Sequence, residues 1–114
     1  MDVDQREVKG VLVLNLSGDV SIITVEGLKG FFKAAVDSGT QKVLLNMDKV
    51  SYIDSLGLAT LIGFYRQIEN GGGALALSNI TPKVASIFRI TKVDKAFDIY
   101  KSEDEAVKAL NGKN

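Results

Sequence analysis

The sequence contains no cysteine and no histidine among its 114 residues. Without cysteine the chain has no disulfide framework, no thiolate metal site and no thiol redox chemistry. Without histidine it lacks the usual general base near neutral pH and the commonest protein ligand for metals. These two absences remove most of the chemistry by which small enzymes work.

An excess of charge of one sign is also missing, since 14 basic residues balance 14 acidic ones. Nucleic-acid binders normally carry a basic excess or a basic stripe, and neither is present. The first seven residues are polar and do not resemble a signal peptide. No apolar run approaches the roughly 18 residues typical of a membrane helix. We therefore expect a cytoplasmic protein that binds neither nucleic acid nor a membrane.

The apolar residues form alternating runs of strand type and helix type. Near-continuous apolar runs predict strands at residues 11–16, 42–47, 74–77 and 97–100. Helical spacing follows each run, and N-cap residues predict helix starts at Thr24, at Asp54 or Ser55, at Thr81 and at Ser102. Lys9 and Gly10 predict a hairpin turn before the first run.

Strands that alternate with helices favour an α/β fold with a mixed, mostly parallel sheet of about five strands flanked by helices. Neither a linker nor an internal repeat interrupts the pattern. We expect a single domain over residues 1–114.

Ser55 stands at the predicted junction between the second of these strands and its helix, in the segment YIDSLGL of residues 52–58. The nucleophile elbow of hydrolases needs glycine two residues before the serine, and Ile53 occupies that position. No histidine can take the proton, and no lysine is marked out as a substitute base, although a serine–lysine pair stays open. We predict that the chain is not an enzyme.

A plainer interpretation is that Asp54 or Ser55 only caps the helix, since both are favoured cap residues. Capping does not explain Gly57, because glycine in a first helical turn forgoes about 1 kcal/mol of helix propensity relative to alanine. The absent side chain would instead leave the Ser55 hydroxyl open to a large partner.

Two further patterns, a run of glycines and a pair of aspartates, do not match known ligand sites. The glycines at 71–73 follow a helix and precede a strand, which is the reverse of a phosphate-binding loop, so they predict a helix end and a tight turn. Asp48 and Asp54 lack companion histidines and a calcium-loop spacing. We expect no metal site and no cofactor.

At residues 54–58 (DSLGL) the sequence resembles the STAS domain of bacterial anti-sigma-factor antagonists. The resemblance covers nearly the whole chain. It includes the run 11–16 leading into Gly18-Asp19, residues 43–46 before 50–55, the glycines 72–73 before a strand, and residues 78–84 followed by Phe88.

In that family the serine is phosphorylated by a partner kinase that doubles as the anti-sigma factor. The resemblance implies that Ser55 accepts the phosphate. It also implies that the partner contacts Asp19, Ser21, Asp54, Ser55, Leu56 and Gly57. The chain departs from the family at two positions: Ser21 stands where aspartate is frequent, and Leu56 stands where a small residue is frequent.

The resemblance therefore implies a phosphoregulated partner-switching protein. Unphosphorylated, it would bind an anti-sigma-factor-like serine kinase and free the client of that kinase, and a PP2C-type phosphatase would reset it. The alternative is a STAS scaffold or transport-system subunit, in which Ser55 is only a helix cap. The DSLGL segment favours the first hypothesis, and the missing acid at Ser21 favours the second.

Overall fold

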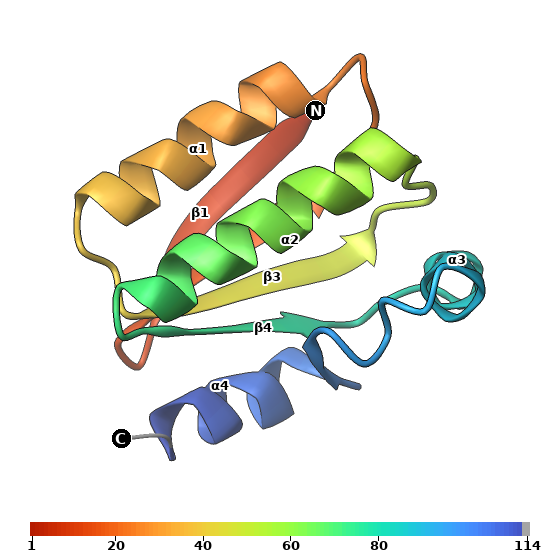
Figure 1. Cartoon of the computed structure of the whole chain (residues 1–114). Coiled ribbons are helices and arrows are strands. Elements are labelled where there is room, and N and C mark those ends of the chain that lie inside the picture. The colour runs from red at the N-terminus through yellow and green to blue at the C-terminus, as the bar shows by residue number, and fades with distance from the viewer. Residues whose placement is uncertain (113–114) are drawn as a thin grey trace.

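The alternation of strands and helices in the sequence is retained in the computed structural model (Figure 1), which describes residues 1–112. The expected domain end at residue 114 lies outside this range. Within it the elements are β1 (Asp2–Val8), β2 (Val11–Ser17), α1 (Val25–Asp37), β3 (Lys42–Lys49), α2 (Ser55–Asn70), β4 (Ala74–Ser78), α3 (Pro82–Ile90), β5 (Asp98–Tyr100) and α4 (Glu103–Asn111).

The strands form one sheet in the order β1-β2-β3-β4-β5. β1 is antiparallel to β2, and each of the other neighbouring pairs is parallel. The predicted α/β fold with a mixed, mostly parallel sheet is therefore confirmed for the described residues.

Helices cover both faces of the sheet, and this explains why the strands are apolar without strict alternation. Helices α1 and α2 lie side by side on one face, and α4 lies on the other (Figure 1). In β2, Val11 and Val13 belong to the cluster under α4, whereas Leu14 and Leu16 belong to the larger cluster under α1 and α2. The strand predicted at residues 11–16 is thus buried from both sides.

The hairpin between β1 and β2 turns at Lys9 and Gly10, as predicted. Both residues have positive φ, 51° for Lys9 and 83° for Gly10, which is the backbone of a two-residue type I′ turn. The strand that precedes it, β1, is polar and mostly exposed or half-buried. An edge strand of this kind has no apolar period, so the sequence predicted the turn but not the seven-residue extent of β1.

Three of the four predicted cap residues make a capping hydrogen bond, Asp54 among them, and the fourth does not. Thr81 accepts a hydrogen bond from Val84 N at 3.3 Å, and Ser102 accepts one from Glu105 N at 3.2 Å. Thr24 occupies the cap position of α1, but its hydroxyl makes no capping bond. The predicted cap position of Thr24 is therefore confirmed, but its hydroxyl bonds inside the preceding turn and not to the helix.

The glycines after α2 make the predicted helix end and turn. Gly71 ends the helix and Gly72 has φ of 85°. A Cβ at Gly73 would lie 2.5 Å from the carbonyl oxygen of Gln41, so the two chain segments approach too closely for any side chain. The turn is therefore structural, as the order helix–glycines–strand indicated.

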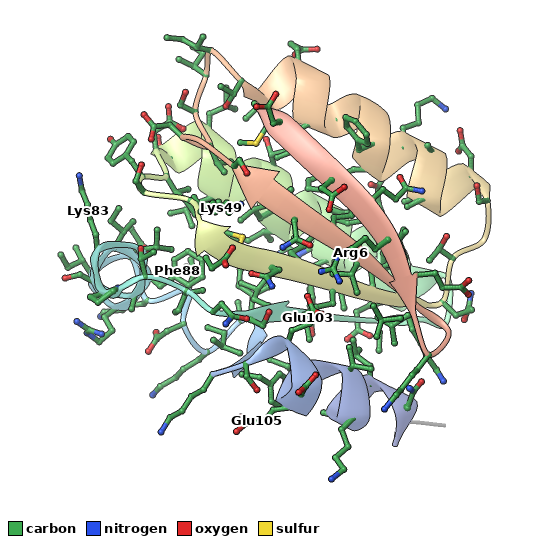
Figure 2. The ribbon with its side chains drawn as sticks, turned by 180° about the vertical axis from the view of Figure 1, so that it is seen from behind. Arg6, Lys49, Lys83, Phe88, Glu103 and Glu105 are labelled. Atoms are coloured by element: carbon green, nitrogen blue, oxygen red, sulfur yellow. The ribbon has the colours of Figure 1, made fainter. Side chains whose placement is uncertain are left out.

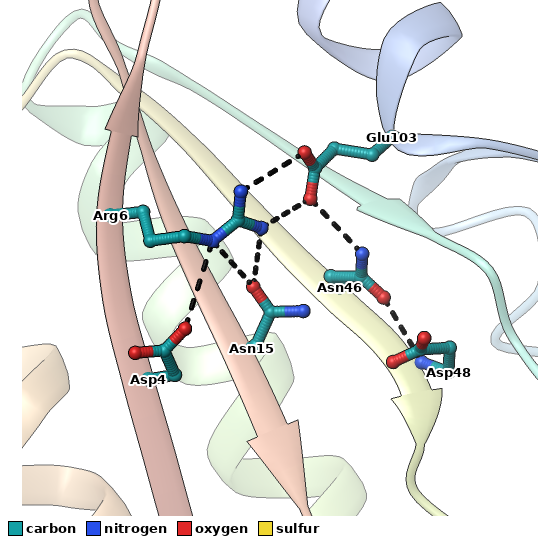
Figure 3. Close-up of polar contacts among 6 residues, drawn as sticks. All are labelled: Asp4, Arg6, Asn15, Asn46, Asp48 and Glu103. Atoms are coloured by element: carbon teal, nitrogen blue, oxygen red, sulfur yellow. Dashed lines mark hydrogen bonds and ion pairs between the residues drawn. The ribbon is translucent and has the colours of Figure 1, made fainter.

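A polar network joins β1 to the start of α4 across the face of the sheet opposite α1 and α2 (Figures 2 and 3). The guanidinium of Arg6 donates to both carboxylate oxygens of Glu103 and, at 2.6 Å, to the side-chain oxygen of Asn15. Asn46 donates to Glu103 at 3.2 Å. The hydrogen bond from Arg6 is the main cause that lowers the pKa of Glu103, and burial opposes it.

Removing the charge of Glu103 tests this network. We expect Glu103→Gln to lower the free energy of unfolding by about 1 kcal/mol at pH 7, because the pair is partly exposed. The pKa of Glu103 lies below its usual 4.5, so the stabilisation is present at neutral pH and is lost as the pH falls through the lowered value. Urea denaturation of both proteins at pH 7 and at about pH 3 should show the difference closing.

The matched control is Glu105→Gln, which removes the same charge from the same helical turn at an exposed side chain (Figure 2). It should change stability by less than about 0.5 kcal/mol. Equal destabilisation by the two variants would show that negative charge at the start of α4, and not the contact with Arg6, accounts for the change in the free energy of unfolding.

Candidate functional site

Ser55 is the first residue of α2 and is exposed at the end of the sheet where β3 stops (Figure 1). The cap residue of this helix is Asp54, whose backbone is extended. Among the described residues, none forms a hydrogen bond with the Ser55 hydroxyl. The alternative left open by the sequence is thus resolved: Asp54 caps the helix, and the hydroxyl of Ser55 is unused.

Asp54 uses both carboxylate oxygens to join two chain segments. Its Oδ1 accepts a hydrogen bond from Gly57 N at 2.7 Å, and its Oδ2 accepts one from Ile22 N at 2.9 Å. These N–H groups, that of Gly57 first, lower the pKa of the Asp54 carboxyl. The carboxylate is therefore ionised at neutral pH and holds the loop after β2 against the start of α2.

The backbone of Val20 strengthens the same junction. Val20 N donates to Tyr52 O at 2.9 Å, and Asp54 N donates to Val20 O at 3.1 Å. Nearby, Ser51 Oγ donates to Asp19 Oδ1 at 2.9 Å. The segments around residues 19–22 and 51–54 are consequently bound side by side, although about thirty positions separate them in the sequence.

The turn that carries Ser21 is held from within. The hydroxyl of Thr24 accepts from Ser21 N at 2.9 Å and donates to Asp19 O at 2.7 Å. Ser21 is half-buried, and its own hydroxyl accepts from Ile23 N at 3.3 Å. Thr24 therefore shapes the turn that presents residues 21–23 beside the start of α2.

Gly57 is buried, and its missing side chain has a different explanation from the one that the sequence suggested. A Cβ at Gly57 would lie 2.3 Å from Val20 O, well inside any normal contact. The glycine thus makes room for the backbone of Val20 and does not clear space for a partner beside Ser55. The earlier interpretation of Gly57 is wrong, because the absent side chain would point into the protein.

Exposed apolar side chains lie in the residues next to Ser55 in the sequence and in the loop that is bound to Asp54. Within residues 1–112, four large apolar residues of these segments are exposed: Ile22 at 68%, Ile23 at 89%, Tyr52 at 42% and Leu56 at 39%. We call them the apolar rim. Grouped exposed apolar residues mark interaction surfaces more often than scattered ones do.

Only Leu56 of the rim was among the predicted contact residues. The signal for two others was present in the sequence, where Ile22 and Ile23 interrupt an otherwise polar turn. The Nζ atom of Lys83, a residue of α3 labelled in Figure 2, lies 5.6 Å from the centre of the Tyr52 ring, so α3 also borders the site.

Across residues 1–112, no group of three or more acidic side chains is placed to hold a metal ion. In the same part of the chain, every helix is too short or too polar to span a bilayer.

The contact between Gly57 and Val20 can be tested directly. We expect Gly57→Ala to lower the free energy of unfolding by about 1–3 kcal/mol, because the new methyl group overlaps the Val20 carbonyl. Gly63→Ala is the control in the same helix, since no heavy atom lies within 4 Å of its Cβ position. It should raise stability by up to about 1 kcal/mol. Thermal or urea unfolding separates the two, and equal stabilities would contradict the contact.

The chain is similar in sequence and in fold to known proteins. BtrV of Bordetella bronchiseptica is 28% identical over 110 residues, covering 96% of this chain and 95% of BtrV. The anti-sigma F factor antagonist of Paenibacillus polymyxa is 24% identical over 111 residues, covering 96% of this chain and 95% of that protein.

Among solved structures, the Bacillus protein SpoIIAA has the same fold. Its unphosphorylated form matches with a TM-score of 0.75 and 22% identity over 98% of this chain and 100% of that one. Its phosphorylated form matches with a TM-score of 0.72 and 21% identity over 96% of this chain and 99% of that one. The family model described as the STAS domain matches residues 2–106. Because that match spans nearly the whole chain, the protein belongs to the STAS domain family.

Proposed function

We propose that this protein is a cytoplasmic anti-sigma factor antagonist whose binding to its partner is controlled by phosphorylation of Ser55. The observation that carries the proposal is the exposed, unbonded hydroxyl of Ser55 at the start of α2, in segments that also carry the apolar rim. Relatives that bear the name anti-sigma factor antagonist support it. So does the structural likeness to a family member that was solved in a phosphorylated form.

The proposed partner is a serine kinase that acts as the anti-sigma factor. It would transfer the terminal phosphoryl group of its own ATP to Ser55 Oγ, releasing ADP and the hydroxyl proton. Asp54 is engaged with Gly57 N and Ile22 N, so the kinase has to supply the base as well as the nucleotide. A PP2C-type phosphatase would hydrolyse the phosphoserine and restore the binding form. This protein itself would not be an enzyme.

Physical chemistry favours a switch that leaves the fold intact. A phosphoryl group adds about −1.5 to −2 charges at pH 7. The free N–H groups and the positive end of the helix dipole at the start of α2 stabilise that charge. A partner docked on the apolar rim would instead meet a new dianion beside the Asp54 carboxylate. Unfavourable charge at a desolvated interface costs several kcal/mol, which changes an affinity by orders of magnitude.

A STAS scaffold or a subunit of a transport system is the second candidate. The serine at position 21, where family members often have aspartate, is the observation that favours it. In that case the apolar rim would still bind a partner, but a charge at Ser55 would not be the regulator.

Variants of Ser55 separate the two candidates. Ser55→Ala keeps a small neutral side chain, and since Asp54 is the cap it should fold normally and bind the proposed partner kinase as wild type does. Ser55→Asp places a negative charge beside Asp54 and should bind at least about tenfold more weakly. Isothermal titration measures both affinities. Mass spectrometry after incubation with ATP should map phosphate to Ser55 and find none on Ser55→Ala.

Two results would contradict the switch. Equal affinity of wild type, Ser55→Ala and Ser55→Asp would favour the scaffold. Phosphate mapped to another residue would move the regulated site away from the start of α2.

A further inference from the structure

Helices α1 and α2 are separated at the surface by a groove of about 750 Å³ (Figure 1 shows the two helices side by side). Its bottom is formed by Phe32 of α1 and Phe64 of α2, whose rings stack with centroids 3.9 Å apart and an angle of 7° between their planes. Both phenylalanines are buried. The groove therefore lies on a tightly packed aromatic base.

One side of the groove is a face of α2 that begins one residue after Ser55. Leu56, Thr60, Gly63 and Gln67 line it and recur every three or four positions, which places them on one side of the helix. Leu56 also belongs to the apolar rim around the phosphorylation site. The groove is thus continuous with the candidate site, and a partner that covers Ser55 can extend a segment into it.

The charge of the groove is predominantly positive. Lys29, Lys33 and Arg66 line it together with one acid, Asp37. Lys33 is paired with Asp37 at 2.7 Å, and Lys29 lies 3.6 Å from Glu26 outside the groove. Among the described residues, Arg66 forms no ion pair. The groove therefore offers an unpaired guanidinium above an apolar base, in a chain whose net charge is zero.

From this arrangement we propose that the groove between α1 and α2 receives an acidic segment of the partner kinase with an apolar anchor. The carboxylates of that segment would pair with Arg66 and the lysines, and its apolar side chain would pack over Phe32 and Phe64 beside Gly63. The inference rests on the proposed function and adds a second contact to it, one that lies along α2 and carries no phosphate.

Filling the groove tests the proposal without weakening the fold. Gly63→Met puts a side chain into open space and replaces a helical glycine with a better helix former, so thermal stability should not fall. We expect its affinity for the proposed partner kinase to drop about tenfold or more. Gly30→Met is the matched control, because Gly30 is a helical glycine of α1 with equally open space that does not line the groove. Its affinity should match wild type within about twofold.

The charge is tested by Arg66→Gln. Its affinity should fall about threefold or more at low salt, and the salt dependence of binding should become shallower than that of wild type. An unchanged affinity and salt dependence would rule out the acidic segment.

The outcomes distinguish this inference from the proposed function. If Gly63→Met binds the kinase as wild type does while Ser55→Asp binds weakly, the proposed binding of a partner segment in the groove is wrong and the proposed regulation at Ser55 is not affected. Equal losses in Gly63→Met and Gly30→Met would also overturn it, since the effect would not be specific to the groove. If the kinase does not bind wild type at all, both proposals fall.

Discussion

The close approach of Val20 to Gly57 determines where α2 begins, and with it where Ser55 is presented. Only glycine fits against the Val20 carbonyl, because a Cβ would come within 2.3 Å of its oxygen. The same carbonyl accepts a hydrogen bond from Asp54 N, and Asp54 in turn binds Gly57 N and Ile22 N. Backbone and side chain thus fasten the loop after β2 to the helix at one place. The position of the apolar rim depends on that junction.

This junction explains why the Ser55 hydroxyl forms no hydrogen bond among the described residues while the adjacent Asp54 carboxylate is fully engaged. Serine at a helix start commonly caps the helix, but here Asp54 is the cap. The hydroxyl of Ser55 is therefore not needed to cap α2. A change at Ser55 can therefore alter the surface without removing a cap. The loop that bears Ile22 and Ile23 is held by backbone bonds and by Asp54, which keeps this loop with its exposed apolar side chains at the start of α2. A proposed switch of this kind needs a fixed surface and one variable charge.

Much of the fold could be predicted because it depends on local patterns. The buried strands, the turn at Lys9 and Gly10 and the caps at Thr81 and Ser102 each leave a signal within a few residues. The start of α2 and the exposure of Ser55 were also predictable from the cap residues and the helical spacing that follows them.

What the sequence could not predict depends on contacts between distant segments. The explanation inferred for the glycine at position 57 was wrong because Val20, which packs against Gly57, is distant from it in the sequence. Thr24 is the cap residue of α1 as predicted, but the use of its hydroxyl in the preceding turn depends on the fold of that turn. The groove beside Gly63 is a property of two helices together, and neither helix indicates it alone.

The most direct test of the central claim uses the phosphorylated protein itself, prepared with phosphoserine incorporated at position 55 during translation so that no kinase is needed to make it. Isothermal titration against the kinase, with thermal unfolding of both forms, measures binding and folding separately. The account predicts the same unfolding temperature within a few degrees and an affinity at least about tenfold weaker for the phosphorylated form. Equal affinities, or a phosphorylated form that unfolds, would contradict it.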